Sequence, residues 1–275
     1  MKLRLVFLYV LLLTVISAAA PEAPASEKTA MHLRLRTQIQ PYPGSTSWTE
    51  ANFDEAVPAA KTAIIITDMW DKHWCGGATR RVEQIAKRME PVLSKARAAG
   101  VLIIHAPSDT MAYYANTRGR QLALDAPFVA PPTGRRIARP ALPIDDSDGG
   151  CDTPGDTAQR AWTRENPALS ISPEDVISDQ GREIYNVLRE RGIDTVFFMG
   201  VHANMCILNR TFGMRQLSEW GIRCILVRDL TDAMYNPASR PYVSHAKGVD
   251  LMIGYIERYA GPSITSGELL ESLER

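Results

Sequence analysis

Short apolar runs alternate along this chain with segments in which apolar residues recur every three or four positions. Four runs have the Ile, Val, Leu and Phe content of strands buried on both faces of a parallel sheet: Thr62–Thr67, Val101–His105, Thr195–Met199 and Cys224–Val227. Helical spacing occurs in Thr79–Ala99, Thr117–Leu124, Gln180–Arg191 and Tyr242–Tyr259. This alternation predicts right-handed βαβ units and an α/β fold whose mostly parallel sheet carries helices on both faces.

Three further segments modify this pattern. Leu33–Gln38 alternates apolar and polar residues, which indicates an edge strand before the core begins, and a loop with Pro and Gly follows it. Pro91 lies inside the longest helical segment and predicts a kink or a break between two helices. Residues 126–174 are rich in Pro, Gly and Asp and exceed ordinary connection length, so we predict a functional or mobile insertion.

The stretch Gly192–Trp220 carries the strongest chemical signal. Its strand ends near Gly200, and from Asn204 onward the apolar positions change to the helical period. Cys206 therefore falls in the first turn of a helix at the carboxyl end of a strand, where open α/β sheets bind ligands. The unpaired N–H groups and the helix dipole are expected to lower the thiol pKa there, which suits a nucleophile. The alternative is that Cys206 is a small buried hydrophobic residue without a chemical role.

Three motifs resemble the isochorismatase-like cysteine hydrolases. GVHANMC is similar to the turn that carries that family's catalytic thiol, TAIIITDMWDKHWC to its first strand ending in an Asp-Met pair, and RCILVRDLTDAM to the strand after the nucleophile helix. The resemblance spans roughly residues 62–259. It implies a three-layer α/β/α, Rossmann-like domain covering residues 26–275, dimers or larger assemblies, and Cys206 as the nucleophile.

The resemblance also assigns Asp68, which follows the first strand directly, as the group that exchanges protons with the thiol and the leaving group. The family's catalytic Lys precedes the helix that leads to the nucleophile strand, and here that region, residues 166–188, contains no Lys. We assign Lys72, four residues after Asp68, as the replacement cation. Arg160 and Arg164 of the insertion are alternatives that supply charge but cannot act as bases.

The residues around the nucleophile turn are assigned to substrate and oxyanion binding. In the resembled family, a cis peptide bond precedes the position of His202, so Val201 and His202 are expected to form it and the His202 N–H to help hold the oxyanion. The His202 side chain is expected at the pocket wall, with activation of Cys206 as an alternative role. Trp70 and Trp74 are predicted to line the pocket.

A metal site is the weaker interpretation. Asp71, His73 and His105 have the side chains that bind Zn²⁺, but their spacing matches no known motif, so we predict no metal and no cofactor. The Asp-rich part of the insertion lacks the regular alternation of a loop-type Ca²⁺ site and is interpreted as a polar lid. A metal-dependent hydrolase using these three residues stays open as an alternative.

The start of the chain has the pattern of a secretory signal peptide. Lys2 and Arg4 precede the apolar run Leu5–Ile16, which is short for a transmembrane span, and small residues follow. We assign residues 1–25 to the signal peptide and a tether, and expect an exported protein, periplasmic or secreted. Of the four cysteines, Cys75 and Cys151 are the favoured disulfide pair, and Cys224 is expected as a core thiol.

The formal net charge is zero, with no basic block, which argues against nucleic-acid binding and against electrostatic membrane binding after cleavage of the signal peptide. The sequence thus predicts an exported cysteine hydrolase that cleaves a small amide-type C–N bond through Cys206. The competing hypothesis is a binding or assembly protein that kept the fold after losing the catalytic Lys.

Overall fold

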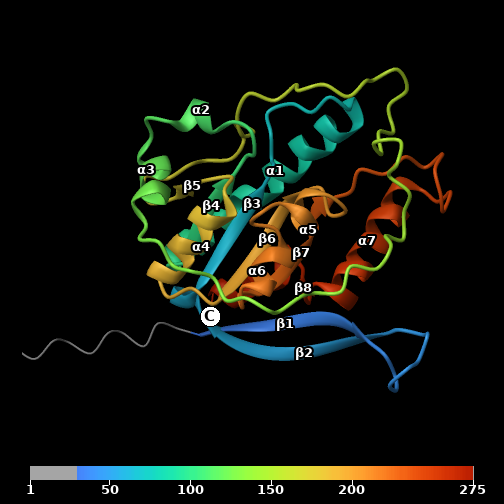
Figure 1. The fold of residues 1–275 in the computed structure, drawn as a ribbon, viewed down its shortest axis with the longest axis horizontal. Coiled ribbons are helices and arrows are strands. Elements are labelled where there is room, and N and C mark those ends of the chain that lie inside the picture. The colour runs from blue at the N-terminus through green and yellow to red at the C-terminus, as the bar shows by residue number, and fades with distance from the viewer. Residues whose placement is uncertain (1–29, 275) are drawn as a thin grey trace, which may run out of the picture.

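A single mixed sheet organises residues 30–274, which the computed structural model describes (Figure 1). Its strands lie in the order β2-β1-β8-β7-β6-β3-β4-β5. The strands are β1 (Ala30–Ile39), β2 (Thr49–Pro58), β3 (Thr62–Thr67), β4 (Leu102–Ala106), β5 (Val176–Ile177), β6 (Thr195–Val201), β7 (Arg223–Asp232) and β8 (Ser263–Ile264). Strands β3 to β8 pair in parallel, and β1 pairs antiparallel with β2 and β8. The predicted mostly parallel sheet is confirmed.

Helices cover both faces of the sheet. They are α1 (Gly76–Ala98), α2 (Met111–Tyr114), α3 (Arg118–Asp125), α4 (Gly181–Glu190), α5 (Cys206–Asn209), α6 (Met214–Glu219), α7 (His245–Tyr259) and α8 (Ser266–Glu274), with a 3₁₀ turn at Ala59–Lys61. Side chains alternate along β3, so Ile65 packs against the core under α4, α6 and α7 while Ile64 and Ile66 pack under α1 and α8. This double burial explains why the central strands are uninterrupted apolar runs.

The predicted edge strand is not the edge. Arg36 of β1 pairs with Ser263 of β8, and β2 forms a ten-residue hairpin partner on the outer side of β1. The sequence of β2, TEANFDEAVP, gave no strand signal because almost all of it is exposed and no apolar alternation is needed. The exposed acidic side chains of this strand discourage pairing with another edge.

Two helix predictions need correction. α1 runs without interruption through Pro91, because the sheet and α8 hold the helix on both sides of the missing N–H. The single helix predicted after Asn204 is instead two short helices, α5 and α6, separated at Gly213. Both pack against the same core cluster, so their apolar residues keep the spacing of one helix although the backbone turns between them.

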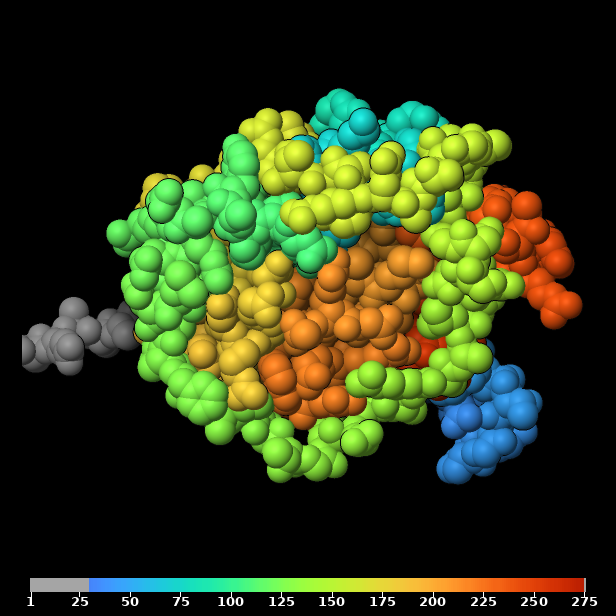
Figure 2. All heavy atoms as spheres, turned by 45° about the horizontal axis from the view of Figure 1, so that its top comes forward, coloured from blue at the N-terminus to red at the C-terminus, as the bar shows by residue number. Residues whose placement is uncertain are grey.

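The insertion, residues 126–174, has no helix and no strand but is tied to the body along its length. Figure 2 shows it, in green and yellow, as a rim around the residues of α5 and α6, in orange. The disulfide between Cys75 and Cys151 fixes its middle, which confirms the favoured pairing, and Cys224 is a buried free thiol in β7, as expected. The proposed signal peptide lies outside the described residues. Within residues 30–274, no helix is both long and apolar enough to cross a bilayer.

A buried ion cluster holds the last part of the insertion. His105 at the end of β4 is fully buried, with Nδ1 2.6 Å from a Glu165 carboxylate oxygen and Nε2 3.1 Å from Asp175 Oδ2. Arg97 of α1 donates to the same Asp175 carboxylate. Burial alone would lower the pKa of His105, but the charge of Glu165 and hydrogen bonds to both carboxylates raise it to about 9. His105 is therefore an imidazolium at neutral pH.

Because of this cluster, the free energy of unfolding is expected to decrease at alkaline pH. Because the folded-state pKa of His105 lies above its unfolded value of 6.5, the stabilisation is fully present below pH 6.5 and is lost as the pH rises through about 9. The contribution is on the order of 3 kcal/mol. We expect the free energy of urea unfolding to fall between pH 7 and 10 in the wild type. His105→Gln should be less stable at pH 7 and show a flatter profile, and parallel profiles for the two proteins would contradict this assignment.

Candidate active site

Asp68 and Cys206 meet at the carboxyl edge of two neighbouring parallel strands. Asp68 follows β3, Cys206 begins α5 after β6, and Thr67 pairs with Gly200. The strands approach so closely that a Cβ at Gly200, where φ is +107°, would lie 2.1 Å from the Thr67 carbonyl oxygen. Only glycine fits there. The predicted pair is brought together: the Cys206 thiol lies close enough to Asp68 for each group to shift the pKa of the other.

Arg210 supplies the positive charge of this site. Its Nε donates to Asp68 Oδ2 at 3.0 Å, while Asp68 Oδ1 accepts the Ser108 N–H at 2.8 Å. Asp68 is completely buried, and its φ of +48° turns the chain sharply after β3. Arg210 follows Cys206 by four residues, directly after α5, so the helical turn places nucleophile and cation on the same side. Thiol, carboxylate and guanidinium form one chain of contacts.

Lys72 does not have the role predicted for it. Its side chain is exposed and makes no ion pair with any residue between 30 and 274. The insertion arginines are also directed elsewhere: Arg164 donates to the Tyr113 hydroxyl, and Arg160 donates to the Asp109 carbonyl. The Asp109 carboxylate, in turn, lies 3.7 Å from Arg210. The cation paired with Asp68 is therefore Arg210, which the sequence interpretation overlooked, and not Lys72.

The electrostatics of Cys206 differ from the expectation of a lowered thiol pKa. Burial, and next the negative charge of Asp68, raise the pKa of Cys206 well above its ordinary value, while Arg210 and the hydrogen bond from the His202 N–H act in the opposite direction. Burial likewise raises the pKa of Asp68 against the charge of Arg210. A four-residue helix contributes too little dipole to reverse this. The resting site thus holds a neutral thiol beside Asp68, whose own pKa is raised and which is paired with the Arg210 guanidinium.

The turn between β6 and α5 has the predicted backbone. The Val201–His202 peptide bond is cis, and the His202 N–H donates to the Cys206 sulfur. The neighbouring Ala203 N–H donates to the Asp232 carbonyl at 2.7 Å. Burial lowers the pKa of His202 to about 3, so its imidazole is neutral at neutral pH but a much weaker base than an ordinary histidine. The backbone of His202, not its side chain, is the part that faces the nucleophile.

An aromatic cluster joins the loop after β3 to the insertion. The rings of Trp70 and Trp162 stack with centroids 4.1 Å apart, and Trp70 Nε1 donates to the Ser108 carbonyl. The ring of His73 lies 5.8 Å from Trp162, 5.3 Å from Trp74 and 5.2 Å from His202. Trp70 and Trp74 thus belong to one cluster that reaches His202. Their predicted contact with substrate stays a prediction.

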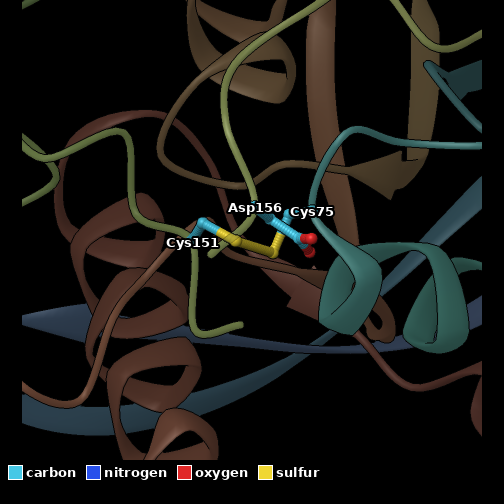
Figure 3. Close-up of side chains that lie close together, drawn as sticks. All are labelled: Cys75, Cys151 and Asp156. Atoms are coloured by element: carbon cyan, nitrogen blue, oxygen red, sulfur yellow. A yellow bond between two sulfur atoms is a disulfide. The ribbon is translucent and has the colours of Figure 1, made fainter. Parts of the chain in front are cut away.

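The three residues considered for a metal site do not come together. Asp71 accepts hydrogen bonds from Thr163, His73 Nδ1 accepts the Cys75 N–H, and His105 belongs to the buried ion cluster. Among residues 30–274, the group of potential ligands that converges is Cys75, Cys151 and Asp156 (Figure 3). Its two sulfurs are bonded to each other, so they are not thiolates. The metal-dependent hydrolase is not supported by this geometry.

Comparisons with known proteins agree with the fold. No protein-family model and no curated protein sequence matches the chain. A cysteine hydrolase from Pseudomonas syringae pv. phaseolicola 1448A has a similar structure, with 22% identity, 79% of this chain and 94% of that protein covered, and a TM-score of 0.52. An isochorismatase family protein from Burkholderia thailandensis aligns at 16% identity over 78% of this chain and 97% of its own, with a TM-score of 0.45. The chain has the α/β fold of the Pseudomonas syringae cysteine hydrolase.

The coupling of thiol, carboxylate and guanidinium predicts opposite effects of two substitutions. Asp68→Asn removes the negative charge beside the thiol, so the apparent pKa of Cys206 should fall. Arg210→Gln removes the stabilising cation, so the shared proton should be held more tightly and the apparent pKa should rise. The pH dependence of iodoacetamide alkylation, read at the Cys206 peptide by mass spectrometry, measures both. Cys224, whose pKa burial raises to about 12, is the unreactive internal reference.

If the apparent pKa of Cys206 moved in the same direction in Asp68→Asn and Arg210→Gln, the assigned contacts would be contradicted. Lys72→Ala is the matched control, because this exposed cation lies in the loop after Asp68 without pairing to it. We expect its profile to overlay that of the wild type.

Proposed function

We propose that this protein is a cysteine hydrolase that cleaves a small amide-type C–N bond. The observation that carries the proposal is the position of Cys206 and Asp68 at neighbouring strand ends, with the Asp68 carboxyl accepting from Arg210 at 3.0 Å. Acyl transfer needs a nucleophile and a base beside it, and a cation beside the base stabilises the charges that develop. The similarity to a cysteine hydrolase structure supports the same reading at the level of the fold.

In the proposed reaction, Asp68 takes the thiol proton as the sulfur attacks the carbonyl carbon. The backbone N–H groups of His202 and Cys206 hold the oxyanion. Asp68 then gives its proton to the leaving nitrogen, the C–N bond breaks, and a thioester with Cys206 remains. Asp68 next removes a proton from a water molecule that attacks the thioester. The carbon–sulfur bond then breaks, Asp68 returns this proton to the sulfur, and the acid is released with the thiol restored.

Burial explains why Asp68 suits both directions of this proton transfer. A carboxyl with a raised pKa binds the thiol proton more readily than a solvated one and can still release it to an amine. The positive charge of Arg210 lowers the pKa of Asp68 against the larger effect of burial, and it opposes the negative charge of a developing thiolate. A guanidinium cannot exchange protons at neutral pH, so its role is electrostatic and the proton stays with Asp68.

The same proposal includes export and self-assembly. The disulfide between Cys75 and Cys151 suits an oxidising compartment, as does the apolar pattern of residues 5–16. Cys206 is half-buried, and its thiol is neutral at rest, which makes it less reactive toward oxidants than a thiolate. A small-molecule amide is the proposed partner, and a homo-oligomer is proposed from the family resemblance alone.

Ammonia or amine release from a panel of small primary and secondary amides tests the hydrolase. Cys206→Ala should abolish turnover, and Asp68→Asn should reduce kcat by roughly a hundredfold to ten-thousandfold. Arg210→Lys should retain more activity than Arg210→Gln, because it preserves the charge beside Asp68. Cys224→Ala, which removes a buried thiol in β7 away from Asp68, is the control and should keep wild-type kcat.

Capture of the thioester by mass spectrometry, as an acyl adduct on the Cys206 peptide, would identify the nucleophile directly. A wild-type protein that releases nothing from the panel, forms no adduct and still binds amides would support the competing binding-protein hypothesis. Turnover that survives in Cys206→Ala would exclude the mechanism.

A further inference from the structure

A charged network lies beside the nucleophile turn without taking part in the proposed chemistry. Arg81 in the second turn of α1 donates from Nε to Asp232 Oδ2 at 2.7 Å and from Nη1 to Asp152 Oδ2 at 2.6 Å. His245 at the start of α7 binds the other Asp232 oxygen through Nε2 at 2.8 Å. Asp232 is almost fully buried. Arg81 thus bridges two carboxylates that belong to the end of β7 and to the insertion.

The Asp232 side of this bridge leads to the oxyanion peptide. Asp232 pairs with Val201 across β6 and β7, and its carbonyl accepts the Ala203 N–H at 2.7 Å. Residues on both sides of His202 are therefore held by one residue of β7. Because the His202 N–H donates to the Cys206 sulfur, a movement of Asp232 would shift the donor that faces the nucleophile.

The Asp152 side leads to the disulfide. Asp152 follows Cys151, whose disulfide partner Cys75 directly precedes α1. Its carboxylate lies so close to the helix that a Cβ at Gly77 would be 2.1 Å from Asp152 Oδ1. Two constraints, one covalent and one ionic, therefore fix this part of the insertion to the first two turns of α1.

A second contact from the same segment reaches the nucleophile turn directly. Asn204 donates from Nδ2 to Asp146 Oδ2 at 2.7 Å, and it also exchanges hydrogen bonds with the backbone of Met234. The backbone of Gly150 packs against the Met234 carbonyl, where a Cβ would lie 2.3 Å away. The segment from Asp146 to Asp152 therefore contacts the turn that presents Cys206 directly at Asn204, and it reaches Ala203 through Arg81 and Asp232.

We propose that Arg81 is a positioning residue. It links residues 146–152, which the disulfide fixes to α1, to Asp232, and Asp232 in turn holds the His202 peptide opposite Cys206. Only the expected effect of Arg81 on turnover rests on the proposed function. Its effect on the thiol is independent of any substrate. Without Arg81, the Asp232 carboxylate keeps only its hydrogen bond to His245 and can move. The distance between the His202 N–H and the Cys206 sulfur is then no longer fixed.

Arg81→Gln tests the transmission, with Arg80→Gln as the matched control on the same helix. Arg80 is exposed and makes no ion pair in the described part of the chain. In Arg81→Gln, the apparent pKa of Cys206 in alkylation should rise by about one unit, a tenfold loss of thiolate at a fixed pH below it. With an amide substrate, kcat should fall by about a hundredfold and KM should change by less than about threefold. Arg81→Lys should restore part of both.

The disulfide is tested by a double-mutant cycle. Removing both sulfurs with Cys75→Ser and Cys151→Ser should shift the alkylation profile of Cys206 in the same direction as Arg81→Gln. The combined variant should shift it no further, because both changes break one route. Urea midpoints show which variants are folded at the assay temperature, and Asp152→Asn replaces Arg81→Gln if the latter is not.

The outcomes separate this inference from the proposed function. A changed Cys206 profile in Arg81→Gln, without any turnover in the wild type, supports the positioning role and counts against the hydrolase. A folded Arg81→Gln or Asp152→Asn protein with the wild-type profile and wild-type kcat overturns the positioning role, whatever the substrate. Fully additive shifts from the disulfide and Arg81 would show two separate routes and likewise overturn it.

Discussion

The ion pair between Asp68 and Arg210 is the interaction on which the site depends. A carboxylate with no exposed surface is expensive unless it is paired and hydrogen-bonded, and Asp68 has the Arg210 guanidinium on one oxygen and the Ser108 N–H on the other. This pairing leaves a base that can accept the Cys206 proton without exposure to water. The same burial that raises the thiol pKa therefore creates the partner that can remove its proton.

The surrounding structure can be understood as support for that pair. Gly200 lets β6 approach β3, which brings the end of one strand to the nucleophile and the end of the other to the base. On one side, the buried His105 cluster fixes the last part of the insertion near the loop after β3. On the other side, Arg81 and the disulfide fix its middle near the nucleophile turn. An insertion without helices or strands acquires a defined path from these side-chain contacts.

The replacement of a lysine by an arginine from a different element bears on the competing hypotheses. Loss of the family's residue by itself favours a protein that kept the fold and lost the chemistry. The guanidinium at Asp68 restores the charge at that carboxylate from one helical turn after the nucleophile. Arg binds a carboxylate with a planar fork and keeps its charge at any physiological pH. The loss of the Lys alone therefore does not leave Asp68 without a paired cation.

The sequence alone determined the α/β class and the positions of Asp68 and Cys206 at strand ends, because residues buried on both faces of a sheet and residues on one face of a helix recur with different local spacings. It favoured Cys75 and Cys151 as the disulfide pair but could not choose among the three pairings. It missed β2, whose exposed face needs no apolar pattern, and it placed the cation at Lys72. Only the tertiary structure decided that Arg210 pairs with Asp68 and that the thiol pKa is raised. The pairing and the pKa shift depend on which groups are buried next to one another in the folded protein. A local sequence pattern contains no information about desolvation or about the distance between two strands.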